Sequence, residues 1–217
     1  MTTDLISPGL DSPGLAGLGQ APPVVRASDR GAATRNALLM AARVVFVRDG
    51  YAQAAVTDIV GQAGASVGSL YHHYTGKAGL YLALFDQLHH DHTKRTRRAV
   101  RRARAAGVTD PMQLFLAGAR AYLDSNIEQR ELAGLFARGD GPPGFEVVWQ
   151  QRLAEWVGKN TEFFARSGEP LDEAVAIVMT GALMLAVGEA SRAEDNCRAR
   201  QIADGVISVL SRLETHC

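Results

Sequence analysis

The apolar residues of this chain recur with the period of an α-helix. Between Leu38 and Phe46 they stand at positions i, i+3, i+4, i+7 and i+8, on one side of a helix. The same period returns in successive segments as far as Leu213, and no segment alternates apolar and polar residues as a strand does. The chain is therefore expected to be all-α, and its 217 residues, 47% of them hydrophobic, suffice for a buried core.

Glycine, proline and capping residues divide this pattern into helices. Gly50 and Gly64 follow the first two helical segments, and glycine ends helices because it adopts positive φ without strain. Ser66 is a predicted N-cap, and Asp110-Pro111 combines a cap with proline at the first helical position. The predicted helices span residues 29–50, 56–63, 67–74, 77–106, 111–128, 130–138, 145–167, 171–192 and 198–213, with a loop at 139–144.

The N-terminal residues show no pattern of a secretory leader. Residues 1–28 are rich in Gly and Pro without apolar periodicity, which predicts a disordered tail. The chain shows neither a basic and apolar leader nor 18 consecutive apolar residues, so we expect a cytoplasmic protein that binds no membrane. The cysteines Cys197 and Cys217 lack metal-binding spacing and predict neither a metal site nor a structural disulfide.

The overall neutrality of the chain averages two oppositely charged parts. Residues 26–104 hold 13 Lys or Arg against five Asp and no Glu, whereas residues 105–217 hold ten basic against sixteen acidic residues. A basic half is typical of a nucleic-acid contact, because each phosphate that a cation neutralises releases counterions. The asymmetry suggests a polyanionic partner for the N-terminal half.

Two short helical segments joined by a turn at Gly64 have the form of a helix-turn-helix, whose second helix enters the DNA major groove. The residues of this region resemble the DNA-binding signature of the TetR (tetracycline repressor) family over about residues 34–85. The matching residues are Gly50-Tyr51, Asp58-Ile59, Ala63-Gly64-Ala65-Ser66, Gly68-Ser69-Leu70-Tyr71-His72-His73-Tyr74 and Lys77.

The resemblance implies a homodimeric transcription regulator, most simply a repressor released from its operator by a small molecule. It implies a helix-turn-helix domain at residues 29–77 and a helical effector-binding and dimerisation domain at residues 78–217. The predicted partners are double-stranded operator DNA, a small-molecule effector and a second copy of the chain. No cofactor is expected.

The residues expected to contact DNA read bases or hold phosphates. Base readout is assigned to the start of the third helix, at Val67, Gly68 and Ser69, with Thr57 reaching from the second. Ser66, the predicted cap of the third helix, is also expected to contact DNA. Tyr71 and Arg35 are expected at the phosphate backbone, and the resemblance places His72, His73 and Lys77 there too.

The signature is incomplete at three positions. Ala54 and Ala55 stand where the family usually carries a Thr or Ser cap, and Val67 replaces a frequent polar or basic residue. The most direct use of Val67 in readout is an apolar contact with a thymine methyl group.

Large aromatic and methionine side chains on the later helices are candidates for the effector cavity. Cavities between helices are lined by such residues with a few polar groups, although ordinary cores use the same types. The predicted lining, for a hydrophobic or aromatic effector, comprises Phe115, Tyr122, Phe136, Trp149, Trp156, Met179 and Met184.

The last two helices carry the predicted dimer interface. Small residues permit close helix approach, and the apolar stripe of the final helix would be exposed in a lone subunit. The predicted interface comprises Gly181, Ala182, Ala186, Val206, Val209, Leu210 and Leu213. A twofold dimer would present two recognition helices to a palindromic operator.

Other patterns carry less weight. The basic run from Lys94 to Arg104 wraps around its helix about 25 to 40 Å beyond Lys77, so we assign it to the helix dipole and the acidic half rather than to DNA. His89, His90 and His92 lack a further ligand at metal-binding spacing, and we predict no metal. No catalytic motif is present, so an enzyme is the least favoured alternative, behind a helical protein-interaction module with vestigial DNA binding.

Overall fold

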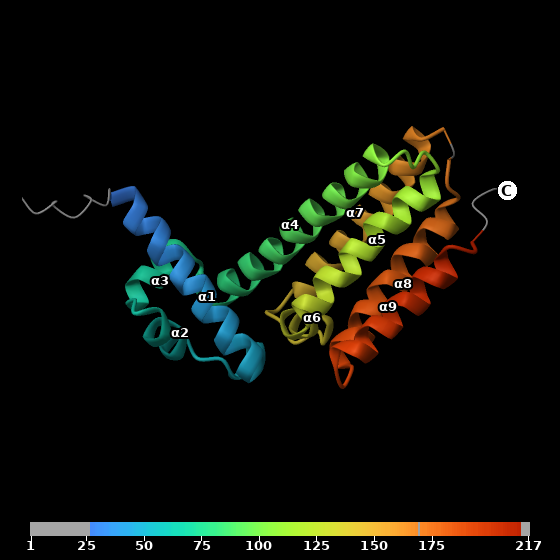
Figure 1. Cartoon of the computed structure of the whole chain (residues 1–217). Coiled ribbons are helices and arrows are strands. Elements are labelled where there is room, and N and C mark those ends of the chain that lie inside the picture. The colour runs from blue at the N-terminus through green and yellow to red at the C-terminus, as the bar shows by residue number, and fades with distance from the viewer. Residues whose placement is uncertain (1–26, 169, 214–217) are drawn as a thin grey trace, which may run out of the picture.

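The computed structural model of the chain describes residues 27–168 and 170–213 (Figure 1). The predicted tail, residues 1–28, lies almost wholly outside this part. Within the described residues the protein is all-α, as predicted, with nine helices and no strand. They are α1 (Ala27–Gln53), α2 (Val56–Ala63), α3 (Val67–His73), α4 (Gly76–Ala105), α5 (Pro111–Glu128), α6 (Arg130–Ala137), α7 (Phe145–Arg166), α8 (Glu173–Arg192) and α9 (Asn196–Leu210).

The first three helices form a compact unit because each buries an apolar face against the others. Phe46 of α1, Ile59 of α2 and Leu70 of α3 are fully buried. Gly64 has positive φ and turns the chain between α2 and α3, as predicted. Gly50 also has positive φ, and it interrupts the helical conformation of α1, which resumes for one short turn.

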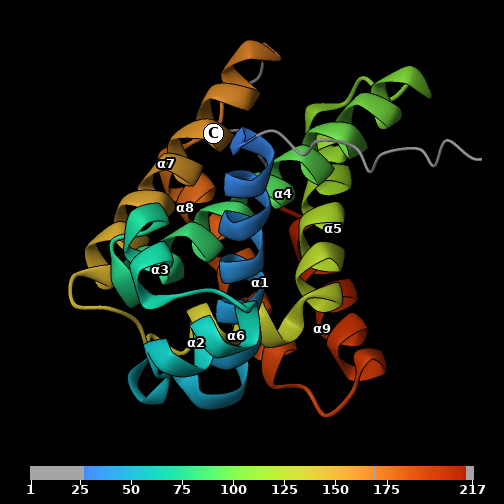
Figure 2. The same ribbon diagram turned by 90° about the vertical axis from the view of Figure 1, so that its left-hand side faces the viewer.

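Helix α4 leads from this unit to a bundle of the remaining helices (Figures 1 and 2). α4 packs along α5, while α8 packs on α5, α6, α7 and α9. The core of the first unit does not end at residue 77, because Tyr81 and Phe85 of α4, Phe136 of α6 and Phe145 of α7 belong to it. The helix-turn-helix unit is thus continuous with the bundle through shared packing.

Side-chain caps explain why two helices begin at residues other than those predicted. α8 begins at Glu173 rather than 171 because the carboxylate of Asp172 accepts hydrogen bonds from the backbone N–H groups of Ala174 and Val175. α9 begins at Asn196 because Asp195 accepts one from Arg198. The other boundaries agree with the predictions within a few residues.

Helix α8 is long and apolar enough, by length and composition, to cross a membrane. It nevertheless packs against four other helices, and 44% of its apolar window is buried in the chain. A helix at the centre of a bundle needs the same composition.

Candidate nucleic-acid interface and effector cavities

Helix α3 lies at the end of the molecule remote from α8 and α9 (Figures 1 and 2). The hydroxyl of Ser66 caps it, accepting the N–H of Ser69 at 3.1 Å, as predicted. Val67 is 45% exposed and Gly68 is exposed, whereas Leu70 is completely buried. Thr57 is exposed on the first turn of α2. The first turn of α3 therefore offers free side chains while its opposite side anchors the helix.

Tyr71 projects from α3 beside the start of α4. Its side chain is 61% exposed, and its ring lies so close to Gly76 that a Cβ there would approach a ring carbon to 3.1 Å. Gly76 also has a φ of 79°, so only glycine suits both the backbone and the neighbouring ring. Tyr71 is thus held in place with its outer surface free.

The remaining predicted phosphate contacts surround α3 unevenly. His72 is exposed and His73 half-buried, with their rings 4.9 Å apart. The exposed guanidinium of Arg35 lies over the ring of Tyr74, 5.1 Å from its centroid, and the Tyr74 hydroxyl donates to the Arg35 carbonyl at 3.1 Å. Arg35 is thereby positioned beside α3.

Lys77 has a different place from the one the sequence suggests. Its Nζ donates to the carbonyl oxygens of Tyr51, Ala52 and Ala54 at 2.8, 3.2 and 3.0 Å, and it lies 4.5 Å from the centroid of the Tyr51 ring. An ammonium has three N–H donors, and all three are used here. This corrects the assignment of the Lys77 side chain to a phosphate, since it instead ties the end of α1 to the start of α4.

The absence of a capping side chain at the start of α2, which the sequence predicts, is confirmed. Its N-cap, Ala55, makes no side-chain hydrogen bond to the helix. Ala54 is buried in the core of the unit, which accounts for an apolar residue there. α2 is held by packing rather than by a cap.

Comparison with known proteins agrees with this geometry. The family model described as bacterial regulatory proteins, tetR family, matches residues 38–84. A crystal structure of a TetR-family transcriptional regulator from Pectobacterium atrosepticum aligns over 85% of this chain and 96% of its own, with 25% identity and a TM-score of 0.58. The chain therefore carries the DNA-binding domain of the TetR family and shares the fold of a TetR-family regulator.

Curated relatives also match the N-terminal part of the chain. The HTH-type transcriptional regulator TtgR of Pseudomonas putida is 38% identical over 74 residues, 33% of this chain and 35% of that protein. The HTH-type transcriptional activator FasR of Mycolicibacterium smegmatis is 36% identical over 90 residues, 42% of this chain and 39% of that protein. The chain thus spans little more than a third of these relatives' lengths.

Two neighbouring cavities lie among the described residues of the bundle. The first, of about 530 Å³, lies where α4, α5, α6, α7 and α8 meet the loop 139–144. The second, of about 670 Å³, lies between α4, α5, α7 and α8, farther from α3. Both volumes suit a drug-sized ligand. Tyr122 and Met184 line both cavities and share a hydrogen bond of 3.7 Å from hydroxyl to sulfur.

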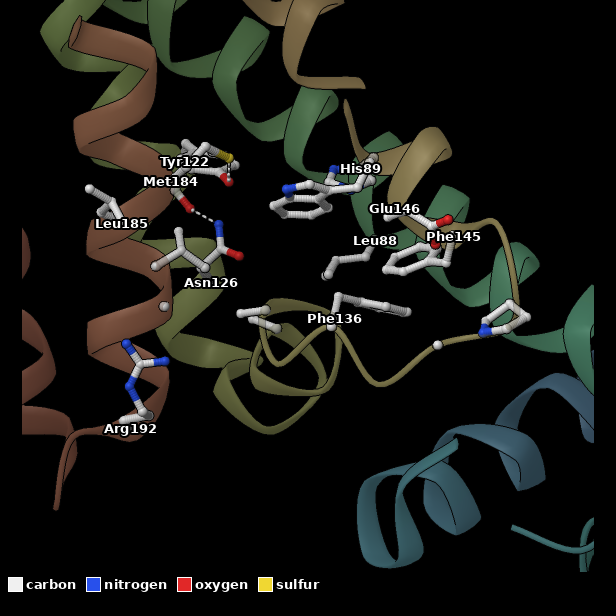
Figure 3. A pocket seen from close by; sticks show the side chains of 18 of the residues that line it. Leu88, His89, Tyr122, Asn126, Phe136, Phe145, Glu146, Met184, Leu185 and Arg192 are labelled. Carbon is white, nitrogen blue, oxygen red and sulfur yellow. Dashed lines mark hydrogen bonds between the residues drawn. The ribbon is translucent and has the colours of Figure 1, made fainter. Parts of the chain in front are cut away.

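Figure 3 shows the first cavity, with Leu88 and His89 opposite Met184 and Asn126. Among the predicted lining residues, Phe136 and Trp149 border this cavity, whereas Phe115 and Trp156 border the second. Met179 is completely buried, borders neither cavity and packs in the core of the bundle. Its assignment to the effector site is therefore withdrawn.

His89 and His92 are buried between the cavities, His89 bordering the first and His92 the second. Burial lowers their pKa values from 6.5 to about 3 and about 4 respectively. Their rings pack on aromatic side chains, and the ring nitrogens have no hydrogen-bond partner in the described protein. Their i, i+3 spacing, which raised the question of a metal, instead places two neutral polar rings at the cavity walls.

An aromatic cluster links the first cavity to α1. The ring of Tyr81 lies 5.0 Å from those of both Phe136 and Phe145 at the cavity, and 5.7 and 5.2 Å from Phe46 and Tyr51 of α1. Burial strongly raises the pKa of Tyr81, whose hydroxyl has no partner in the described part of the chain. The wall of the first cavity is thus in contact with the helix-turn-helix unit of α1, α2 and α3, which is called the DNA-facing unit below.

A second link runs through the loop that borders the first cavity. The backbone N–H of Tyr51 donates to Asp140 at 2.9 Å, and a Cβ on Gly50 would lie 2.6 Å from the same carboxylate oxygen. Gly50 is therefore required by this contact as well as by its φ of 76°. Sequence reasoning missed Asp140 because its partner lies 89 residues away.

The outer side of α8 and α9 forms an exposed apolar face. Three of its residues, Ile177, Val178 and Val209, are more than half exposed, and Leu185 is 74% exposed. The predicted interface residues Gly181, Ala182, Val206 and Leu213 are partly exposed nearby. Ala186 and Leu210, by contrast, are buried within the single chain and are removed from the predicted interface.

Proposed function

We propose that this TetR-family protein is a cytoplasmic, homodimeric transcription repressor that binds a palindromic operator and is released by a small-molecule effector. The observation that carries the proposal is the exposed first turn of α3, capped by Ser66 and held by a buried Leu70. Val67, Gly68, Ser69 and Thr57 read bases, while Tyr71, Arg35, His72 and His73 contact phosphates.

The dimer forms through the apolar face of α8 and α9. Large apolar side chains exposed on two packed helices are typical of an interface, and a twofold contact uses the same residues of both subunits. Since α3 lies at the opposite end of the molecule, this arrangement leaves both recognition helices free (Figure 1). The twofold axis makes the operator a palindrome.

The effector acts through the cavities. A ligand that prefers one orientation of α4 shifts the dimer toward it and changes the spacing of the two α3 helices. The contacts of Tyr81 and Asp140 with α1 give this change a direct route to the DNA-facing unit. A coupling of about 1–3 kcal/mol would change operator affinity about 5- to 150-fold.

Selection from a random pool of duplex DNA tests the DNA-binding half of the proposal. We expect palindromic sequences to be enriched and their binding to weaken steeply with salt. Tyr71→Ala should weaken binding about fivefold or more, whereas the exposed pair Arg98→Gln/Arg102→Gln should not, because it lies more than a Debye length of about 8–10 Å from α3. Enrichment of no sequence, or equal loss in both variants, would contradict the proposal.

A further inference from the structure

The second cavity has an apolar interior and a basic wall. Phe115, Tyr122, Trp156 and Leu183 form much of its interior. Five basic side chains border it from α4 and α7, namely Arg97, Arg101, Arg104, Lys159 and Arg166. The one acidic residue that borders it is Glu162. This composition differs from that of an ordinary helical core.

Part of this positive charge is already used inside the protein. Arg166 pairs with Glu162 at 2.5 Å, and Lys159 pairs with Glu155 at 3.6 Å. The guanidinium of Arg104 lies 5.9 Å from the centroid of the Phe163 ring. All these partners are on α7, so they leave the α4 side of the cavity unneutralised.

Arg97 and Arg101 are the cations without such partners. Neither takes part in an ion pair or side-chain hydrogen bond within the described residues, although both border the cavity. They stand four residues apart on α4, so their side chains lie on the same face of the helix. A guanidinium pair in this position can bind a carboxylate, sulfonate or phosphate group through parallel hydrogen bonds.

The deeper part of the cavity favours neutral groups. His92 is only 3% exposed and is uncharged at neutral pH because burial lowers its pKa. The amide of Asn160 donates to the hydroxyl of Thr180 at 2.9 Å, and neither of these side chains carries a charge. A charged group of the ligand would therefore remain at the arginines, while its apolar body fills the interior.

We propose that the second cavity binds an amphipathic organic anion. Its aromatic or aliphatic body lies among Phe115, Tyr122 and Trp156, and its anionic head pairs with Arg97 and Arg101. This assignment rests on the proposed function only in identifying the bound anion as the effector. These two arginines belong to the basic run of α4 that the sequence analysis assigned to the helix dipole and the acidic half, and in this proposal they supply the selectivity for charge.

Two fluorescent probes with one skeleton test this assignment. 8-Anilinonaphthalene-1-sulfonate carries a sulfonate, and N-phenyl-1-naphthylamine lacks it. In titrations of the full chain, we expect the sulfonate to bind more tightly than the neutral amine. Arg97→Gln/Arg101→Gln should raise the Kd of the sulfonate about tenfold, equivalent to about 1.4 kcal/mol, and leave that of the amine within about twofold.

The pair Arg98→Gln/Arg102→Gln is the matched control. It makes the same change in net charge, at the same spacing on the same helix, outside the cavity lining. We expect it to leave the Kd of the sulfonate unchanged. Equal weakening by both pairs, or equal affinity of the parent protein for the two probes, would overturn the assignment.

The DNA selection described above, run on the same proteins, separates the two proposals. Charge-selective binding with no enriched DNA would support the cavity assignment and contradict the regulatory function. Enriched palindromes with no charge selectivity would support the function and overturn the cavity assignment.

Discussion

Replacing Lys77 by Met removes an ammonium and keeps most of the apolar stem. In the structure this ammonium donates to three carbonyl oxygens at the end of α1 and lies over the ring of Tyr51. A cation at a helix C-terminus stabilises by up to about 2 kcal/mol, and a hydrogen bond from a charged donor by about 1.5–3 kcal/mol. The three bonds share one charge, and only the bond to Ala52 is exposed, while those to Tyr51 and Ala54 are partly buried.

We therefore expect the whole arrangement to contribute about 2–3 kcal/mol. For a chain of this size, with about 2–4 °C lost per kcal/mol, Lys77→Met should lower the melting temperature by about 4–12 °C. Calorimetry measures this shift, and DNA binding at several salt concentrations, well below the melting temperature, measures the phosphate contacts. The salt dependence should stay the same, because the Lys77 side chain neutralises no phosphate.

Lys94→Met is the control, since Lys94 is an exposed α4 lysine with no ion pair or side-chain hydrogen bond among the described residues. It should change neither quantity. The reasoning fails if Lys77→Met leaves the melting temperature within about 1 °C and reduces the salt slope by about 0.9, the effect of one lost phosphate contact.

Three further predictions concern stability and assembly. Folding lowers the pKa values of His89 and His92, so the unfolded chain binds more protons than the folded one as the pH falls below 6.5. Between pH 6.5 and 5, urea denaturation should therefore show that the free energy of unfolding falls by about 1–2 kcal/mol per histidine. A His89→Leu/His92→Leu variant should show a smaller loss. Leu185→Glu places a charge on the exposed apolar face and should convert dimer to monomer in analytical ultracentrifugation. Asp140→Ala leaves the N–H of Tyr51 without its acceptor and should lower the free energy of unfolding by about 1–2 kcal/mol in urea.

Each of these has a matched control. The exposed His90→Leu should leave the pH dependence unchanged, and Asp124→Ala, another exposed carboxylate, should leave stability unchanged. Gln150→Glu adds an exposed charge on α7 and should leave the dimer intact. Steep pH dependence without both buried histidines, a dimer that survives Leu185→Glu, or full stability of Asp140→Ala would each refute the corresponding argument.

The fold could be predicted from local sequence patterns, because the residues next to a helix end decide where the helix begins or stops. Ser66 and Asp110 cap the following turns, with hydrogen bonds to Ser69 and Gln113 only three residues away. Gly64 turns the chain through its own φ. Such features depend on a few neighbouring residues, and for this reason the helix-turn-helix can be located from the sequence.

Side-chain partners distant in sequence could not be predicted in the same way. Lys77 was assigned to phosphate because a cation beside a recognition helix usually faces DNA, but its carbonyl partners are 23 to 26 residues away. On α8, periodicity identified an apolar helix without distinguishing the side facing its own subunit from the side facing outward. Ala186 therefore was assigned to the interface, while the exposed Leu185 beside it was not.

The ammonium of Lys77 adds three hydrogen bonds to the apolar packing between α1 and α4, so a tilt of α4 would carry α1 with it. Opening the angle between these helices would break all three hydrogen bonds, so we expect the DNA-facing unit to move together with the first turn of α4. A 30-residue helix is about 45 Å long, and a tilt of about 5° at its far end displaces its near end by about 4 Å. Successive base pairs are about 3.4 Å apart, so a rotation this small can move the recognition helix α3 by a full base-pair step.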